Sequence, residues 1–261
     1  MNHRRIFPVL TAVLLLACVA DRSRAVDFSL AFPLAEQDRL VIEKSLGKGM
    51  VGEAIAAPKI ENPATYVELT TVNRTYRFLA GPNRGKDEIF RFFPMKQGRS
   101  SATWHYDLGG GEVGFVDVKA DGNVVIAGIQ DSKEGVVTQY SPPEPILLKG
   151  LGAGDEKKLR MLVRVCDLKH PDDLTHEGWL DVVYRYLGAY RLKVPAGTYD
   201  TVLIKSTFNG EIGPATVDDT QYRFFARGTG MVATVEQRDV SAFLVYRPHT
   251  EVAKVLVTKP N

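Results

Sequence analysis

The stretch VPAGTYDTVLIK, residues 194–205, joins a tight turn directly to an alternating strand. Pro195 fixes φ at the end of one strand, and Gly197 supplies a backbone conformation that other residues resist. Beyond the turn, Val202 lies on one face of the expected strand and Lys205 on the other. The stretch therefore predicts a tight antiparallel hairpin, with a long strand leading into it.

That preceding strand, WLDVVYRYLGAYRLKV at residues 179–194, is rich in tyrosine. Strict alternation places one set of apolar side chains on a single face: Leu180, Val182, Tyr184, Tyr186, Tyr190 and Leu192. The run is long enough to require a bend, and Gly188 is the position where a bulge or kink is expected.

Short runs rich in Val, Tyr, Phe, Thr and Ile recur from Thr65 onward, and this inventory predicts about a dozen strands. Asp121-Gly122 is the strongest hairpin signal, and TYVELTTV at residues 65–72 is expected to be a strand that turns at Asn73. The predicted fold class is all-β, mainly antiparallel, as a curved sheet or an open β-barrel that controls its exposed edges.

One helix is expected near the N-terminus, within FPLAEQDRLVIEKSLGKG at residues 32–49. Its apolar face would carry Leu34, Leu40, Val41 and Leu46, and Gly47 would cap its C-terminus. The predicted organisation is an export signal over residues 1–25, this helix and a linker over 26–64, and one β-rich domain over 65–261.

The first residues have the composition of a secretory signal. Arg4 and Arg5 precede an apolar run over residues 6–20, which is short for a membrane span. LLAC, ending at Cys18, resembles a bacterial lipobox, while SRA before Val26 resembles an ordinary cleavage site. The chain is therefore expected to be exported, either to the periplasm or as a lipoprotein anchored through Cys18, with the lipobox slightly preferred.

Composition excludes some classes of function. Lys and Arg number 33 and Asp and Glu 31, so the chain lacks the basic surplus typical of nucleic-acid binding proteins. The second of the two cysteines, Cys166, ends an alternating run, where a small buried residue is expected rather than a nucleophile. If Cys18 is lipidated or removed, no disulfide can form within the chain.

Three motifs in order carry a resemblance to a known family. They are YSPPEPILLKGLGAGDEKKLRM at residues 140–161, the VPAGTY turn, and FFARGTGMV at residues 224–232. Residues 140–247 resemble a family of bacterial envelope proteins of unknown function that carries V-P-A-G-T followed by Phe or Tyr. The resemblance implies a secreted or lipid-anchored β-rich domain, similar to the open barrels of lipoprotein carriers. It implies no reaction and no cofactor.

Catalytic motifs are sparse. His170 and His176 share a loop with Asp172, Asp173 and Glu177, which suggests a divalent metal site, yet their spacing matches no zinc signature. Neither a nucleophile elbow nor a phosphate-binding loop occurs. A protein that is not an enzyme is expected, with a metal-dependent hydrolase using the His170–His176 loop as the least favoured alternative.

Aromatic residues are the positive feature of the C-terminal half. They fill a core or line an apolar cavity, and the candidate ligand-binding face is Tyr184, Tyr186, Tyr190, Phe208, Tyr222 and Phe224. The leading hypothesis is an envelope protein that binds a lipid, another apolar ligand or an envelope protein. The alternative is an assembly accessory without a ligand, whose helix docks on a partner.

Overall fold

The computed structural model describes residues 30–95, 103–242 and 249–259. The predictions of an export signal and of lipidation at Cys18 concern residues 1–29, which lie outside the described residues. Within them the chain forms two helices, α1 (Glu36–Leu46) and α2 (Ala64–Val67), and a 13-stranded sheet. Neither helix has the length and apolar character needed to cross a membrane.

The strands come in two halves of the sequence. The first half holds β1 (Val51–Ile55), β2 (Arg74–Ala80), β3 (Asp87–Pro94), β4 (Trp104–Gly109), β5 (Glu112–Val118), β6 (Val124–Asp131) and β7 (Val136–Leu147). The second half holds β8 (Glu156–Asp167), β9 (Leu174–Val194), β10 (Gly197–Ile212), β11 (Ala215–Ala226), β12 (Gly230–Ala242) and β13 (His249–Leu256).

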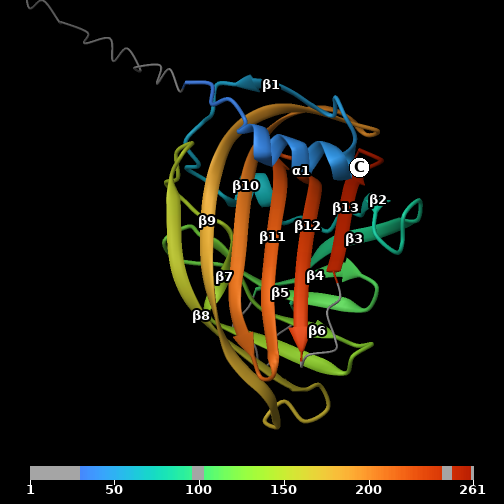
Figure 1. The fold of residues 1–261 in the computed structure, drawn as a ribbon, viewed down its shortest axis with the longest axis vertical. Coiled ribbons are helices and arrows are strands. Elements are labelled where there is room, and N and C mark those ends of the chain that lie inside the picture. The colour runs from blue at the N-terminus through green and yellow to red at the C-terminus, as the bar shows by residue number, and fades with distance from the viewer. Residues whose placement is uncertain (1–29, 96–102, 243–248, 260–261) are drawn as a thin grey trace, which may run out of the picture.

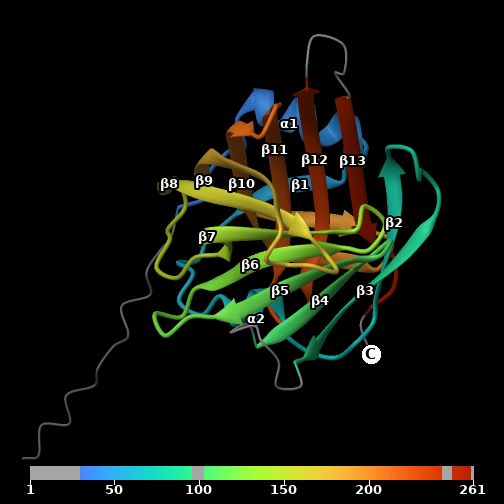
Figure 2. The ribbon, with the colours of Figure 1, turned by 90° about the horizontal axis from the view of Figure 1, so that it is seen from below.

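The sheet is antiparallel and closes on itself. Strand order runs from β9 through β13, then from β2 to β8, and β8 pairs again with β9 to complete a 12-strand barrel. The all-β prediction is confirmed, and the barrel is closed rather than open. In both views β10–β13 run side by side, and β4–β6 cross them on the other side of the barrel (Figures 1 and 2).

The two strongest hairpin predictions are confirmed. Val194 pairs with Gly197 across the Pro195-Ala196 turn, and Gly197 has a φ of 140°, a conformation that favours glycine. Asp121-Gly122 joins β5 to β6, with a φ of 89° at Gly122. Local turn chemistry therefore sets both connections.

The bulge expected at Gly188 is also present. Tyr186 pairs with Ile204 but Gly188 pairs with Leu203, so Leu187 is the extra residue of β9. An extra residue reverses the alternation of a strand. The prediction of a single apolar face along β9 is therefore wrong: Tyr184 and Tyr186 lie in one buried cluster, and Tyr190 and Leu192 lie in another.

The N-terminal part differs from the expectation in two places. The expected linker contains β1, which pairs with the second half of β9. Residues 64–67 form α2 instead of a strand, because Tyr66 and Val67 pack into the interior cluster that also holds Tyr184 and Tyr186. Burial in the tertiary structure outweighs the β-branched composition of this segment.

Helix α1 lies outside the barrel, across strands β10–β13 (Figure 1). Ile42 and Leu46 pack in the same cluster as Tyr222 and Phe224, and Gly47 ends the helix as predicted. Leu40 is 63% exposed, so its assignment to the apolar face is wrong. The buried face of α1 thus covers the barrel of its own chain.

Candidate functional site

The interior of the barrel contains a cavity of about 600 Å³. Strands from both halves of the ring line it, from β2–β8 on one side and β9–β13 on the other. A second hollow, of about 770 Å³, lies outside the barrel between the end of α1 and the β2–β3 turn. The interior cavity is lined by side chains from strands all around the barrel, and its facing walls differ in chemistry, so it is the candidate site.

One wall of the cavity is mainly apolar. It is formed by inward side chains of β3–β8 together with parts of β9 and β10. The apolar residues of this wall are Phe90, Phe92, Tyr106, Leu108, Ile126, Ile129, Tyr140, Ile146, Met161, Val163, Leu180 and Phe208.

The facing wall is polar and belongs to three neighbouring strands, β11, β12 and β13. Its polar members are Asp219, Gln221, Arg223, Thr234, Glu236, Arg238, Thr250 and Lys254. On β11 these residues alternate with Tyr222 and Phe224, which lie in the cluster under α1. The apolar face of β11 is thus its outer face.

Ion pairs join the two walls. Arg223 on β11 lies 3.3 Å from a carboxylate oxygen of Glu144 on β7. Lys254 on β13 lies 2.7 Å from Glu88 on β3. All four residues line the cavity. The Arg223–Glu144 pair joins β11 to β7 across the interior, whereas the Lys254–Glu88 pair spans only the intervening strand β2.

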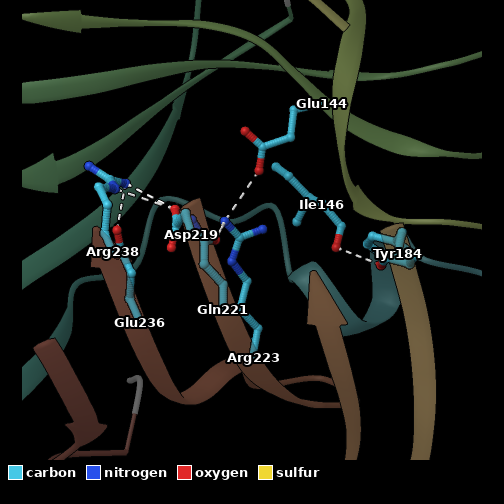
Figure 3. Close-up of polar contacts among 8 residues, drawn as sticks. All are labelled: Glu144, Ile146, Tyr184, Asp219, Gln221, Arg223, Glu236 and Arg238. Atoms are coloured by element: carbon cyan, nitrogen blue, oxygen red, sulfur yellow. Dashed lines mark hydrogen bonds and ion pairs between the residues drawn. The ribbon is translucent and has the colours of Figure 1, made fainter. Parts of the chain in front are cut away.

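A second group of charges lies on the polar wall itself. Arg238 contacts Asp219 at 3.3 Å and also pairs with Glu236, while Gln221 donates a hydrogen bond to Asp219 at 2.7 Å (Figure 3). The other carboxylate oxygen of Asp219, Oδ1, is buried and has no partner among the described residues. The network is therefore incomplete at Asp219.

Burial makes these carboxyl groups weaker acids. Desolvation, followed by repulsion from Glu236, raises the pKa of Asp219 to about 6. Desolvation also raises the pKa of Glu144, although Arg223 acts in the opposite direction. The polar wall can therefore change its charge at mildly acidic pH.

The candidate aromatic face is divided by the structure. Phe208 lines the cavity, whereas Tyr184 and Tyr186 pack in the interior cluster and Tyr184 donates a hydrogen bond to the carbonyl of Ile146 at 2.9 Å. Tyr190 and Tyr222 belong to the cluster under α1, where Tyr222 donates to Asp38 at 2.7 Å.

Phe224 lies in that same cluster under α1. The six aromatic residues therefore do not form one surface, and a ligand-binding role for the five outside the cavity lining stays a prediction. Alternation alone separates the two faces of a strand but does not say which face is inside. Alternation also places Asp219, Gln221 and Arg223 on one face of β11. This spacing in the sequence is the signal from which the polar wall could be predicted.

The other candidate positions lie away from the cavity. His170 is in the β8–β9 turn, where its backbone N–H donates to Asp167, and His176 is on β9. In the ranges that the structure describes, no three His, Cys, Asp or Glu residues are grouped to hold a metal ion. Cys166 is 1% exposed, which fits the predicted core position.

Comparisons with known proteins give no family. No family model matches the chain, and no curated protein matches it. The resemblance to the envelope family with the V-P-A-G-T turn therefore stays a prediction.

Two solved structures are similar in part. A "putative exported protein with YmcC-like fold" from Bacteroides fragilis is 12% identical, with a TM-score of 0.38, and the match covers 77% of this chain and 98% of that one. A "putative lipoprotein" from Parabacteroides distasonis is 13% identical, with a TM-score of 0.35, over 77% and 99% of the two chains. At such TM-scores neither similarity says what this chain binds or where it resides.

Proposed function

We propose that this chain is an exported binding protein, without catalytic activity, that holds a small apolar or amphiphilic molecule inside its barrel. The observation that carries the proposal is the interior cavity of about 600 Å³. This volume is within the range of small-molecule sites, roughly 300–1,000 Å³. A closed barrel whose only task was stability would gain more from a filled interior.

The lining supports a ligand with apolar surface. Phe92, Ile126, Ile146 and Met161 are each at most 8% exposed and line the cavity. Burying apolar surface of a ligand against such side chains contributes roughly 25 cal/mol per Å². The basic, apolar N-terminus with a lipobox-like LLAC favours export and a lipid anchor at Cys18.

The accessory alternative has less support. It needs the apolar face of α1 for a partner, but Ile42 and Leu46 are already buried against the barrel. The hydrolase alternative needs metal ligands grouped around His170 and His176, and the described residues contain no such group. The cavity therefore carries the stronger case.

The test is binding of a neutral apolar dye, phenylnaphthylamine, and its displacement by dodecanol. We expect saturable fluorescence with the intact protein and a loss of about tenfold or more in affinity for Thr234→Phe, whose ring would enter the cavity from the wall. The matched control is Thr216→Phe on the exposed side of β11. Absence of saturable binding in the intact protein, or equal binding in Thr234→Phe, would contradict the proposal.

A further inference from the structure

The cations of the cavity differ in how they are neutralised. Lys254 pairs with Glu88, Arg223 with Glu144, and Arg238 with two carboxylates of the polar wall. Each of these three positive charges is therefore balanced within the protein. Arg74, which also lines the cavity, is different.

Arg74 is 2% exposed and makes three hydrogen bonds, all to neutral groups. Its Nε donates to the carbonyl of Thr229 at 2.9 Å, and its Nη2 donates to the carbonyl of Glu68 at 2.9 Å and to the hydroxyl of Thr70 at 3.1 Å. No ion pair within 4.0 Å joins Arg74 to any carboxylate of the described ranges. Its Nη1 is buried and has no hydrogen-bond partner there.

A purely structural role explains only part of this arrangement. The contacts of Nη2 to Glu68 and Thr70 tie β2 to the segment that follows α2, and the contact of Nε to Thr229 ties it to the turn between β11 and β12. An arginine stays protonated at any pH at which proteins fold, so the charge of Arg74 cannot be relieved by losing a proton. A buried charge that meets only neutral groups is costly, and an anion would satisfy both the charge and Nη1.

An aromatic ring lies beside the guanidinium group, and further apolar side chains line the same cavity. The Phe92 ring lies 5.9 Å from its Cζ atom, and Phe225 and Met231 line the same cavity. An anion bound here would therefore sit beside apolar surface. A free inorganic anion gains no binding free energy from apolar surface, whereas an amphiphile with an acidic head group gains it by burying its tail there.

We propose that Arg74 binds the anionic head group, a carboxylate or a phosphate monoester, of an amphiphilic ligand whose apolar tail lies along the β3–β8 wall. This inference rests on the proposed function and names the ligand class. Arg223, Arg238 and Lys254 are paired, and Lys133, the remaining cation of the described lining, is exposed to solvent. Arg74 is therefore the buried cation of that lining that has no carboxylate partner.

The first experiment uses the unmodified protein and probes that share one tail. Dodecanoate, dodecyl phosphate, dodecanol and dodecylamine each displace the bound phenylnaphthylamine at neutral pH. Because a charge-assisted hydrogen bond in a dry site is strong, we expect one or both anions to bind about tenfold or more tighter than dodecanol. Dodecylamine should bind most weakly.

The second experiment locates the preference. Arg74→Gln should bring dodecanoate and dodecanol to equal affinity, and Arg74→Lys should keep part of the preference because it keeps the charge. Arg77→Gln is the matched control, since Arg77 is on the same strand but points outward and pairs with Asp87. If Arg74→Gln does not fold, two measurements still test the inference: the loss of part of the anion preference in Arg74→Lys, and the anion preference of the intact protein.

The outcomes separate the two proposals. Equal binding of dodecanoate, dodecyl phosphate and dodecanol to the intact protein overturns this inference and leaves the proposed function standing. An anion preference that survives in folded Arg74→Gln overturns it as well. Inorganic phosphate binding as tightly as dodecyl phosphate would overturn the amphiphile assignment. Failure of every probe to bind overturns both proposals.

Discussion

The inner faces of β11–β13 and β3–β8 face each other across one cavity, yet they differ in composition. The β11–β13 wall carries Asp219, Arg223 and Arg238, while the β3–β8 wall is mainly aromatic and aliphatic. The outer face of β11 is apolar instead, because Tyr222 and Phe224 pack beneath α1. The β3–β8 wall thus buries its apolar face inward, whereas β11–β13 bury theirs outward.

The difference shows how a helix that covers the outside of a barrel allows its inner face to be polar. Once α1 shields the outer side of β10–β13, the hydrophobic burial of those strands no longer depends on the interior. The interior face can then hold charges, provided that they are paired. Glu144 supplies part of that pairing from the opposite wall, and Glu88 supplies another part from β3, two strands from β13. The result is a cavity suited to a molecule with one polar and one apolar side.

The largest effect is expected from Phe224→Ala. Phe224 is 0% exposed in the cluster under α1, and its truncation should lower the free energy of unfolding by about 3–5 kcal/mol. Phe208→Ala should cost less, because Phe208 already borders a cavity, and it should weaken binding of the dye. Urea unfolding of both variants tests this. Equal losses of stability would contradict the assignment of Phe224 and Phe208 to different faces.

Asp219→Asn should change how stability depends on pH. The folded state raises the pKa of Asp219 from 3.8 to about 6, so its proton is held more tightly in the folded protein. The stability contributed by this group is present at low pH and is lost as pH rises through this interval, with a size on the order of 3 kcal/mol. Asp219→Asn should therefore gain relative to wild type as pH increases from acidic to neutral.

Unfolding by urea across that pH interval measures the difference. The neighbouring Asp218→Asn, at an exposed position on the other face of β11, is the control. Parallel profiles for wild type and Asp219→Asn would show that the polar wall is not desolvated as described.

Gly188→Ala tests the bulge that reverses β9. Gly188 has a φ of 146°, and a Cβ there would approach the hydroxyl oxygen of Tyr190 to 2.9 Å. We expect a loss of about 1–2 kcal/mol, read from urea unfolding. Gly152→Ala is the control, because its added Cβ would meet only an ordinary contact at 3.5 Å. A neutral Gly188→Ala would argue against a fixed bulge.

The smallest effect is expected at Leu40. Its side chain is 63% exposed, so Leu40→Ala should change stability by no more than about 0.5 kcal/mol. Ile42→Ala, two residues along the same helix and 0% exposed, should cost about 2–4 kcal/mol. Thermal unfolding compares them. A large loss at Leu40 would mean that α1 packs with a different face toward the barrel.

The sequence allowed the local elements to be predicted well. The Pro195-Ala196 and Asp121-Gly122 turns and the Gly188 bulge follow from residues whose backbone preferences are strong. Alternation also separated Val202 from Lys205 correctly, since Val202 lies in the interior cluster and Lys205 contacts Asp38 of α1. These predictions depend on neighbours in the chain.

Most of the site depends on distant contacts, and Phe208 is the one residue of the predicted aromatic face that lines it. Alternation in RTYRFLA places Arg74 on the same face as Tyr76 and Phe78, but a charged residue at the start of a strand is ordinarily expected at the surface, and only the closed ring shows that this face is the interior. Glu144 and Arg223 meet across the interior although they are far apart in the chain. Periodicity places Tyr222 and Phe224 on one face of their strand. It does not specify that a helix covers that face, so it cannot separate these two residues from the residues that line the cavity.

The most direct test of the central claim is native mass spectrometry of the mature protein, extracted gently from its own cells. The account predicts that the intact chain carries a releasable small molecule with an apolar part, and that Thr234→Phe carries none. A bare intact chain, under conditions that preserve its fold, would contradict the claim that the cavity is a binding site.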